Sequence, residues 1–426
     1  MTDYIPELLS LDRILFEHRT YKEAIFKTVM EEKLSSIAKK RVAENVLGVL
    51  RHYFCLSFEC LNLLFYGRDK EEHVLSLVCL YELRYHHAKR PIQEVESSYC
   101  EAFSRQRLAG DAKANFDILR KASQEPFAIP MEVKNSPVLY NSLYLEVPDF
   151  FLKKLSDDYG AKTAMMICQG LHRKPSLFVS SKSETEKTDD MESVTLENKD
   201  VIYRLKKNLS LKEIRERGLY PIGYVEALAF SDVDIPPVQP RLLFTGCEDG
   251  LDLVYLSLKA QQRYQCEISG CFEDDLSYRS GMDTKYHFHL SSLQVFHCPL
   301  KMLKTYTPLK HYDLVVHFSK DLKTGLSGRR PEILPSLNEK AFMKSFQSQL
   351  DDLLEAADFL DKDSTLLFVS HALDREESDD VISRFLSLRK DFVLEKKRAI
   401  LPFEKDTDGG FYAVLKRRSG QNDQHL

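Results

Sequence analysis

Apolar positions in the first third of the chain follow the spacing of amphipathic helices. Between residues 8 and 121, apolar side chains recur at intervals of three and four, as at Val42, Val46 and Val49. This spacing places them on one face of a helix. The few breakers, such as Gly67 and Gly110, fall between candidate helices. The pattern predicts an all-helical domain over residues 1–135.

A small section over residues 136–235 mixes both kinds of pattern. It contains a predicted helix over residues 148–170 and a short β-rich stretch at 177–179. A polar tract then follows, which cannot bury much apolar surface. We expect a linking α+β subdomain with a mobile loop near 180–193.

The last section, residues 236–420, alternates between short apolar β-rich runs and helical stretches. The runs lie at 242–245, 314–317, 366–370 and 411–415, and the main helical stretches lie at 339–360 and 379–388. Strands that alternate with helices predict a mostly parallel sheet with crossover helices. The chain as a whole is therefore expected to be a multi-domain α/β protein.

Composition narrows the setting. The net charge of −5 excludes a wholly basic nucleic-acid binder, although one face can still be basic. Nine cysteines occur without C-x-x-C pairs, no signal segment opens the chain, and the apolar runs are too short for a membrane span. We expect a cytoplasmic protein with reduced thiols and no membrane contact.

Several motifs carry a resemblance. Residues 41–51 read RVAENVLGVLR, residues 116–121 read FDILRK, and residues 148–154 read PDFFLKK before Tyr159-Gly160. His172 to Pro175 follow. Residues 312–333 close with a segment that contains Gly325, Arg329-Arg330 and Pro331-Glu332-Ile333. Residues 365–386 include Glu376-Glu377, and residues 408–416 read DGGFYAVLK.

In this order, the motifs resemble those of the Fmu/Sun type of 16S rRNA (cytosine-5)-methyltransferase. The resemblance covers nearly the whole chain. It implies an N-terminal helical domain similar to the antitermination factor NusB, and a C-terminal Rossmann-like fold that uses S-adenosylmethionine. It also implies rRNA or a ribosomal precursor as the partner, and no DNA.

The chemistry of that family needs residues that this chain replaces. The family adds a cysteine thiolate to cytosine C6, releases the product with a second cysteine, and holds the base with an aspartate. Asp321 and His371 stand at the two cysteine positions, and Phe318 stands at the base-holding position. We therefore expect no methyl transfer by the two-cysteine route. One alternative is a His371–Asp321 pair that acts as a general base.

The cofactor site implied by the resemblance is altered as well. Its candidate residues are Gly246, Asp249 and Gly250 in a strand-to-helix turn, and Asp274 after the next strand. Asp249 replaces a glycine of the family and Leu251 replaces a lysine, so S-adenosylmethionine binding is expected to be weak or lost. No metal is expected, because His287 and His289, which could share a face of a strand, and the nearby Cys298 lack the spacing of a zinc site.

RNA contact is expected from basic clusters in an acidic chain. The candidate residues are Lys39, Lys40, Arg41, Arg51, Lys89, Arg90, Arg329 and Arg330. Two other functions stay open. One is an active S-adenosylmethionine-dependent rRNA methyltransferase with a displaced nucleophile. The other is a NusB-like module for antitermination or assembly, which binds a protein partner through the helical domain.

Overall fold

The structure, a computed structural model of the 426-residue chain, describes residues 5–64, 71–85, 90–105, 111–181, 189–207, 209–263 and 265–418. The chain forms two compact units. The first consists of Met1–His172 and Ser327–Leu337, and the second of Arg173–Leu326 and Asn338–Leu426. The expected domain boundaries after residues 135 and 235 stay predictions.

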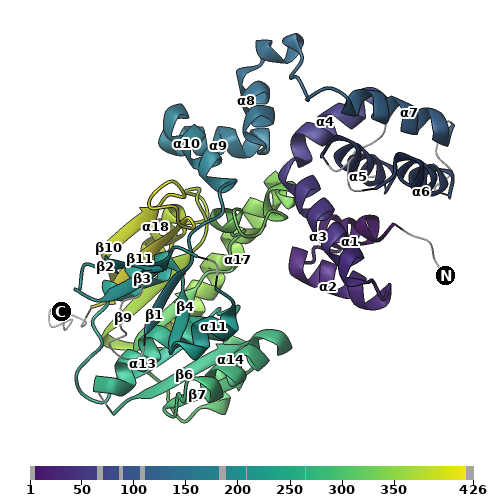
Figure 1. The fold of residues 1–426 in the computed structure, drawn as a ribbon. Helices are drawn as coiled ribbons and strands as arrows, with labels where there is room; N and C mark the ends of the chain where they lie inside the picture. Colours follow the sequence, from purple (N-terminus) through teal and green to yellow (C-terminus); the bar gives the residue numbers. More distant parts are fainter. Residues whose placement is uncertain are drawn as a thin grey trace. The chain divides into compact units, whose positions relative to one another are not determined.

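The described part of the first unit is helical, as predicted. Its core gathers buried residues around the fifth helix, whose apolar side chains from Val74 to Leu83 are buried. The similarity to NusB stays a prediction. The first seven helices are α1 (Pro6–Leu15), α2 (Tyr21–Glu31), α3 (Ser36–Arg51), α4 (Tyr53–Leu64), α5 (Glu71–Tyr85), α6 (Ile92–Arg105) and α7 (Ala112–Ser123) (Figure 1).

Local signals in the sequence explain where these helices begin and how they pack. Thr20 and Glu23 form a capping box at the start of α2, and Ser35 caps α3. Gly48 allows α3 and α5 to approach closely, because a Cβ at this position would lie 1.9 Å from Cζ of Tyr81. This explains the glycine in the 41–51 motif.

The rest of the first unit corrects one prediction. The single helix predicted over 148–170 is wrong, because Gly160 adopts a φ of 79° and divides it in two. The remaining elements are η1 (Met131–Asn135), α8 (Pro137–Leu145), α9 (Asp149–Tyr159), α10 (Ala161–Leu171) and α16 (Ile333–Ser336).

The second unit contains a seven-stranded sheet of the order β10-β11-β9-β8-β5-β6-β7. β5 to β9 are parallel to one another, and β11 runs antiparallel to both β9 and β10. This confirms the α/β class and the mostly parallel sheet. The strands are β5 (Arg241–Thr245), β6 (Glu267–Phe272), β7 (Leu293–His297), β8 (Tyr312–Phe318), β9 (Leu360–Ser370), β10 (Phe392–Ile400) and β11 (Gly410–Arg417).

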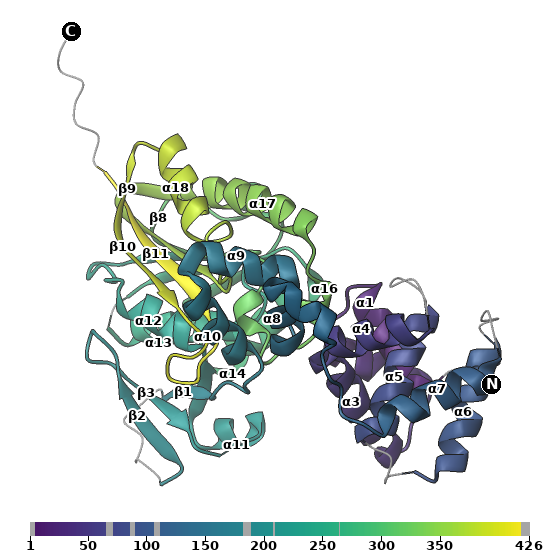
Figure 2. The ribbon, with the colours of Figure 1, turned by 90° about the horizontal axis from the view of Figure 1, so that it is seen from above.

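Successive residues of a strand point to opposite faces of a sheet. In this sheet, helices cover both faces. Leu243 and Val315 pack with α17 (Glu339–Ala357) and α18 (Asp379–Leu388) on one face. Leu242, Leu314 and Val316 pack with α12 (Tyr224–Ser231) and α13 (Val254–Arg263) on the other (Figure 2). α14 (Asp275–His287) connects β6 to β7, with η2 (Gly250–Leu253) before α13 and η3 (Leu300–Met302), α15 (Leu303–Tyr306) and η4 (Thr324–Leu326) in the later loops.

A second, antiparallel sheet of the order β2-β3-β1-β4 occupies the beginning of this unit. The polar tract expected to be mobile lies largely at residues 182–188, outside the described residues. Its expected end at 193 is wrong, because β2 begins at Met191. The elements are β1 (Phe178–Ser181), β2 (Met191–Thr195), β3 (Val201–Leu205), α11 (Leu211–Glu216) and β4 (Leu219–Ile222).

Two findings concern membrane-spanning helices and metal sites. No helix within the described ranges is both long and apolar enough to cross a bilayer. Those ranges also hold no group of three His, Cys, Asp or Glu side chains placed to bind a metal ion. The suggested strand through His287 and His289 is wrong, because His287 ends helix α14 and His289 adopts a φ of 54°.

Candidate functional site

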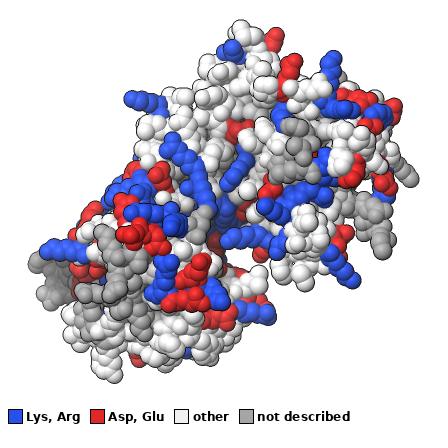
Figure 3. All heavy atoms as spheres, in the orientation of Figure 1, with Lys and Arg blue, Asp and Glu red and all other residues white. Residues whose placement is uncertain are grey.

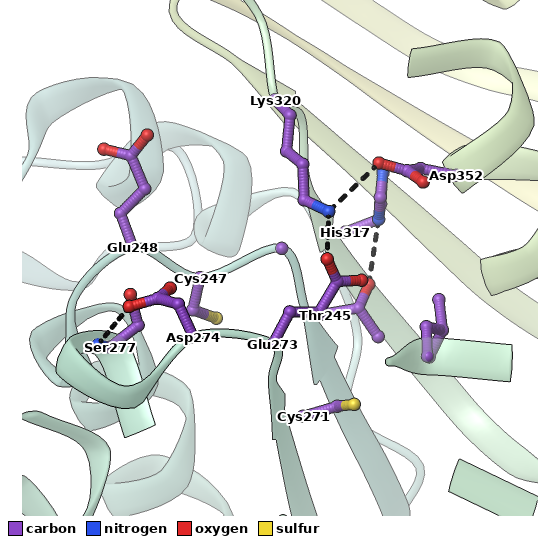
Figure 4. A pocket seen from close by; sticks show the side chains of 12 residues that line it. Thr245, Cys247, Glu248, Cys271, Glu273, Asp274, Ser277, His317, Lys320 and Asp352 are labelled. Atoms are coloured by element: carbon purple, nitrogen blue, oxygen red, sulfur yellow. Dashed lines mark hydrogen bonds and ion pairs between the residues drawn. The ribbon is translucent and has the colours of Figure 1, made fainter. Parts of the chain in front are cut away.

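A cavity of about 300 Å³ opens at the carboxyl ends of β5, β6 and β8 in the second unit (Figure 4). In open parallel sheets, ligands bind at this end of the strands. α17 adds one acidic side chain to the wall. The lining residues are Thr245, Gly246, Cys247, Glu248, Cys271, Glu273, Asp274, Ser277, Leu300, His317, Lys320 and Asp352.

Gly246 fixes the shape of the first wall. Its φ of 71° suits glycine, and a Cβ would lie 1.9 Å from the carbonyl oxygen of Phe318. Of the four predicted cofactor residues, Gly246 and Asp274 line the cavity. Asp249 caps η2 instead, since its Oδ1 accepts from the amide of Leu251 at 3.0 Å and from Ser280 Oγ at 2.8 Å. Gly250 packs against α14, where a Cβ would meet the carbonyl oxygen of Ser280 at 2.3 Å.

Asp274 is the N-cap of α14. Its Oδ1 accepts from the amides of Leu276 and Ser277 at 3.0 and 2.9 Å. Burial acts to raise the pKa of Asp274, but the hydrogen bonds of this cap outweigh it and the pKa is lowered. Asp274 is therefore an anion at the cavity wall.

Lys320 connects two further acids across the cavity. Its Nζ lies 2.7 Å from Glu273 Oε2 and 3.4 Å from Asp352 Oδ2 (Figure 4). Burial acts to lower the pKa of Lys320, but the two carboxylates outweigh it and raise the pKa. None of these three residues was predicted from the sequence. Glu273 stood beside a predicted acid, whereas nothing in the sequence pairs Lys320 with Asp352.

The cavity is acidic overall. Four carboxylate residues line it against one lysine. The remaining titratable cation candidate is His317, whose Nδ1 lies 2.8 Å from Thr245 Oγ1. Burial lowers the pKa of His317 to about 3, so it is neutral at physiological pH. The wall therefore favours positively charged ligands and disfavours phosphates.

Asp321, at one expected cysteine position, is held inside the fold. Its Oδ2 accepts from Ser370 Oγ at 2.6 Å and from the amide of His371 at 2.7 Å, and its Oδ1 accepts from the amide of Lys323 at 2.7 Å. This carboxylate is 7 % exposed. Asp321 therefore fixes the backbone of two loops.

His371, at the other position, is also fully engaged. Its Nε2 lies 2.8 Å from Glu226 Oε1 and its Nδ1 lies 3.3 Å from the carbonyl oxygen of Gly409. Both partners are acceptors, so both ring nitrogens must donate and the ring is an imidazolium. Burial acts to lower the pKa of His371, but the charge and hydrogen bond of Glu226 raise it to about 9.

These contacts overturn the suggested side-chain pair between His371 and Asp321. The imidazole bonds Glu226, and Asp321 receives only the backbone amide of His371. Glu226 comes from α12, 145 residues away in the sequence, and the sequence analysis missed it. The ring of Phe318 packs against Phe230 of the same helix, with 6.4 Å between ring centroids, and is buried in the core.

No cysteine of the chain has the properties of a reactive thiolate. All nine are unpaired and lie in the described part of the chain, and burial raises the pKa of each one. Cys247 and Cys271 line the cavity and share this property.

The basic residues predicted to contact RNA all belong to the first unit, as far as the structure describes them. Lys39, Lys40, Arg51 and Arg329 are exposed, and Lys89 lies outside the described residues. Arg41 and Arg90 form ion pairs with the buried Glu7 and Glu82, both at 3.1 Å. Arg330 lies 3.4 Å from Glu332. On the face drawn in Figure 3, Lys and Arg side chains lie among Asp and Glu side chains.

Two distant segments of this unit meet near Tyr21. Burial raises the pKa of the Tyr21 hydroxyl, Arg51 lowers it, and Glu332 raises it further. Arg51 and Glu332 therefore both lie near Tyr21, although 281 positions separate them in the numbering.

Comparison with known proteins gives a structural match only. No protein-family model and no curated protein matches the chain. PH0851 has a TM-score of 0.74 at 14% identity, over 97% of both chains. A methyltransferase homolog protein from Pyrococcus horikoshii has a TM-score of 0.55 at 13% identity, over 66% of this chain and 99% of that one. NSun6 from Pyrococcus horikoshii, solved with SFG, has a TM-score of 0.51 at 12% identity, over 64% and 99%. These matches show the fold, so the predicted Rossmann-like methyltransferase fold is confirmed.

Proposed function

We propose that this chain is an RNA-binding member of the Fmu/Sun-type rRNA (cytosine-5)-methyltransferase family that does not transfer methyl groups by the two-cysteine route. The ordered motifs and the fold shared with NSun6 support the family assignment. The setting we propose is the cytoplasm, in keeping with nine unpaired thiols.

One observation supports the loss of methyl transfer by the two-cysteine route. The residues at both family cysteine positions are consumed by internal contacts, since Asp321 holds three donors and both nitrogens of His371 donate. An imidazolium has no lone pair to add to cytosine C6 or to accept a proton. Nucleophilic catalysis needs an activated nucleophile, and burial disfavours a thiolate at Cys247 and Cys271.

The cavity fits S-adenosylmethionine in part. Gly246 leaves room where a side chain would clash, the carboxylates of Glu273 and Asp274 suit ribose hydroxyls, and the acidic wall suits a sulfonium cation. When bound, this cofactor would supply an electrophilic methyl group. We propose that it binds weakly, because Glu273 is already paired with Lys320 and the lysine of the family loop is replaced by Leu251.

We propose that RNA, as rRNA or a ribosomal precursor, contacts the first unit. Lys39, Lys40, Arg51 and Arg329 are exposed and can meet phosphates. The paired Arg41 and Arg90 serve mainly to hold helices together.

A protein-binding role is a second candidate, favoured by exposed apolar side chains on the same unit. Phe26 and Met30 lie one turn apart on α2 and are 67% and 62% exposed, and Ile37 is 83% exposed. A variant that loses RNA affinity but still binds a protein partner would favour this role.

The proposed function is tested by incubating the purified chain with unmodified rRNA and S-adenosylmethionine. Nucleoside mass spectrometry should show no 5-methylcytosine above background, and RNA containing 5-fluorocytosine should give no trapped complex. Filter binding of the same RNA should show association. Formation of 5-methylcytosine, lost on His371→Ala, would overturn the proposal and favour an active methyltransferase.

A further inference from the structure

Lys320 is the cation inside the cavity, and its place in the fold is firmly set. The backbone on either side is held by Ser319, whose amide donates to Val369 O at 2.8 Å and whose Oγ donates to Gln349 at 2.6 Å, and by Asp321. Glu377 accepts from the amide of Leu322 at 3.1 Å. The loop is therefore fixed, and Lys320 can respond to a ligand only through its side chain.

That side chain has room to move. The side chain of Lys320 is 42% exposed, and those of Glu273 and Asp352 are 44% and 25% exposed. A partly exposed ion pair contributes little to stability, so a weakly binding ligand can break it. The ammonium can leave Glu273 and turn to water while the backbone stays in place.

The ion pair competes with a ligand for Glu273. A ribose offers two hydroxyl donors, and Glu273 Oε2 already accepts from Lys320 at 2.7 Å. The neighbouring Asp274 spends its Oδ1 on the helix cap. Lys320 therefore withholds Oε2 of Glu273 from a nucleoside, and a ligand that is itself a cation also meets the repulsion of the ammonium.

We propose that Lys320 is a latch that sets both the affinity and the charge selectivity of this cavity for nucleosides. The inference rests on the proposed function for the assignment of the cavity to an S-adenosylmethionine type of ligand. With Lys320 in place, its ammonium opposes the carboxylates of the wall and reduces the preference for a cationic over a neutral nucleoside. Without it, Glu273 and Asp352 lose their cation, and the preference of the cavity for a cationic ligand increases.

Titration calorimetry of the full chain with S-adenosylmethionine and with the neutral 5′-methylthioadenosine tests the latch. Lys320→Met should bind S-adenosylmethionine about tenfold more tightly, because the variant removes both the cost of breaking the ion pair and the repulsion of the ammonium. The gain for 5′-methylthioadenosine should be smaller, about threefold, because only the ion pair matters there. Lys320→Arg, which keeps the charge, should behave like the native chain.

A double variant separates the latch from a merely structural role. Adding Glu273→Gln to Lys320→Met should abolish the gain, since the freed carboxylate is what the ribose uses. Thermal melts identify any variant that has lost its fold. Equal affinity of the native chain and Lys320→Met for S-adenosylmethionine would overturn the latch and leave the cavity assignment intact. Failure of every folded variant to bind either nucleoside would overturn both.

Discussion

Glu226 and His371 form a buried ion pair between α12 and the end of β9, with 2.8 Å between Oε1 and Nε2. The pair fills the position where the resemblance implies a catalytic cysteine. A buried pair of this kind is costly to break, because removal of one partner leaves an uncompensated charge.

The first prediction concerns the ionisation of this pair. The raised pKa of His371, about 9, means that its contribution to stability is complete below the unfolded value of 6.5 and is lost as pH rises through about 9. The pKa of Glu226 is lowered, because the charge of His371 outweighs the effect of burial. Its contribution is therefore present above 4.5 and is lost as pH falls through the lowered pKa. An NMR titration should show His371 changing charge near pH 9.

Glu226→Gln should shift the titration of His371 to lower pH. Without the carboxylate, burial dominates and the pKa of His371 should fall below 6.5. The variant should lose about 2–4 kcal/mol of unfolding free energy at pH 7. Substitution of the exposed His311 by Gln is the matched control and should change neither quantity. A His371 pKa that stays near 9 in Glu226→Gln would refute the pair as its cause.

The second prediction concerns RNA. If Lys39 and Arg51 meet phosphates, the logarithm of the affinity should fall steeply with the logarithm of the salt concentration. The double substitution to alanine should reduce that slope by about 1.5, at about 0.7–0.9 per lost contact. Filter binding at several salt concentrations measures it. Lys362→Ala, at an exposed position in the second unit, serves as the control for loss of a basic side chain, and an unchanged slope in the double variant would place the basic face elsewhere.

The third prediction separates a structural arginine from a contact residue. Arg41→Ala leaves the buried Glu7 with Asn45, which donates to Oε1 at 3.2 Å. Because Glu7 is 1% exposed, the substitution should cost about 2–3 kcal/mol of unfolding free energy. Lys39→Ala, two positions earlier on the same helix, should cost less than about 0.5 kcal/mol. Urea denaturation compares them, and equal costs would argue against the Arg41–Glu7 pair as a stabilising contact.

The fourth prediction concerns the cavity wall. Gly246→Ala meets both an unfavourable φ and a clash with the carbonyl oxygen of Phe318, so it should cost about 3 kcal/mol or more and abolish nucleoside binding. Gly218 has a similar φ of 69°, with nothing within 4 Å of an added Cβ. Gly218→Ala should therefore show the conformational cost alone, about 1–2 kcal/mol. Equal losses in the two variants would contradict the close approach at Gly246.

The elements predicted best were those with strong local signals. The helix over 379–388 matches α18, and the four predicted strands lie within β5, β8, β9 and β11. β6, β7 and β10 were not among those runs, for local reasons. β6 contains Gly270, β7 is a mixed edge strand, and β10, at the other edge, carries four consecutive charged residues over 395–398. The helix predicted to 360 ends at Ala357, because Leu360 already belongs to β9.

The site was predictable only as far as neighbours in sequence define it. Gly246 and Asp274 follow strands directly, so the end of the parallel sheet brings them together. Glu226 and Asp352 reach their partners through helices on opposite faces of the sheet, and no local pattern signals such pairings. The sequence also could not tell that the carboxylate of Asp249 turns to Ser280.

The division of the chain also sets the order in which its two units can be completed during synthesis. Because residues 327–337 belong to the first unit, the backbone passes between the two units three times. Ile333 and Leu334 from this segment are 5% and 4% exposed, so they belong to the interior. A chain emerging from the ribosome therefore cannot complete its amino-terminal unit until most of the large sheet has also been made. This last segment of the unit is encoded more than 150 codons after His172.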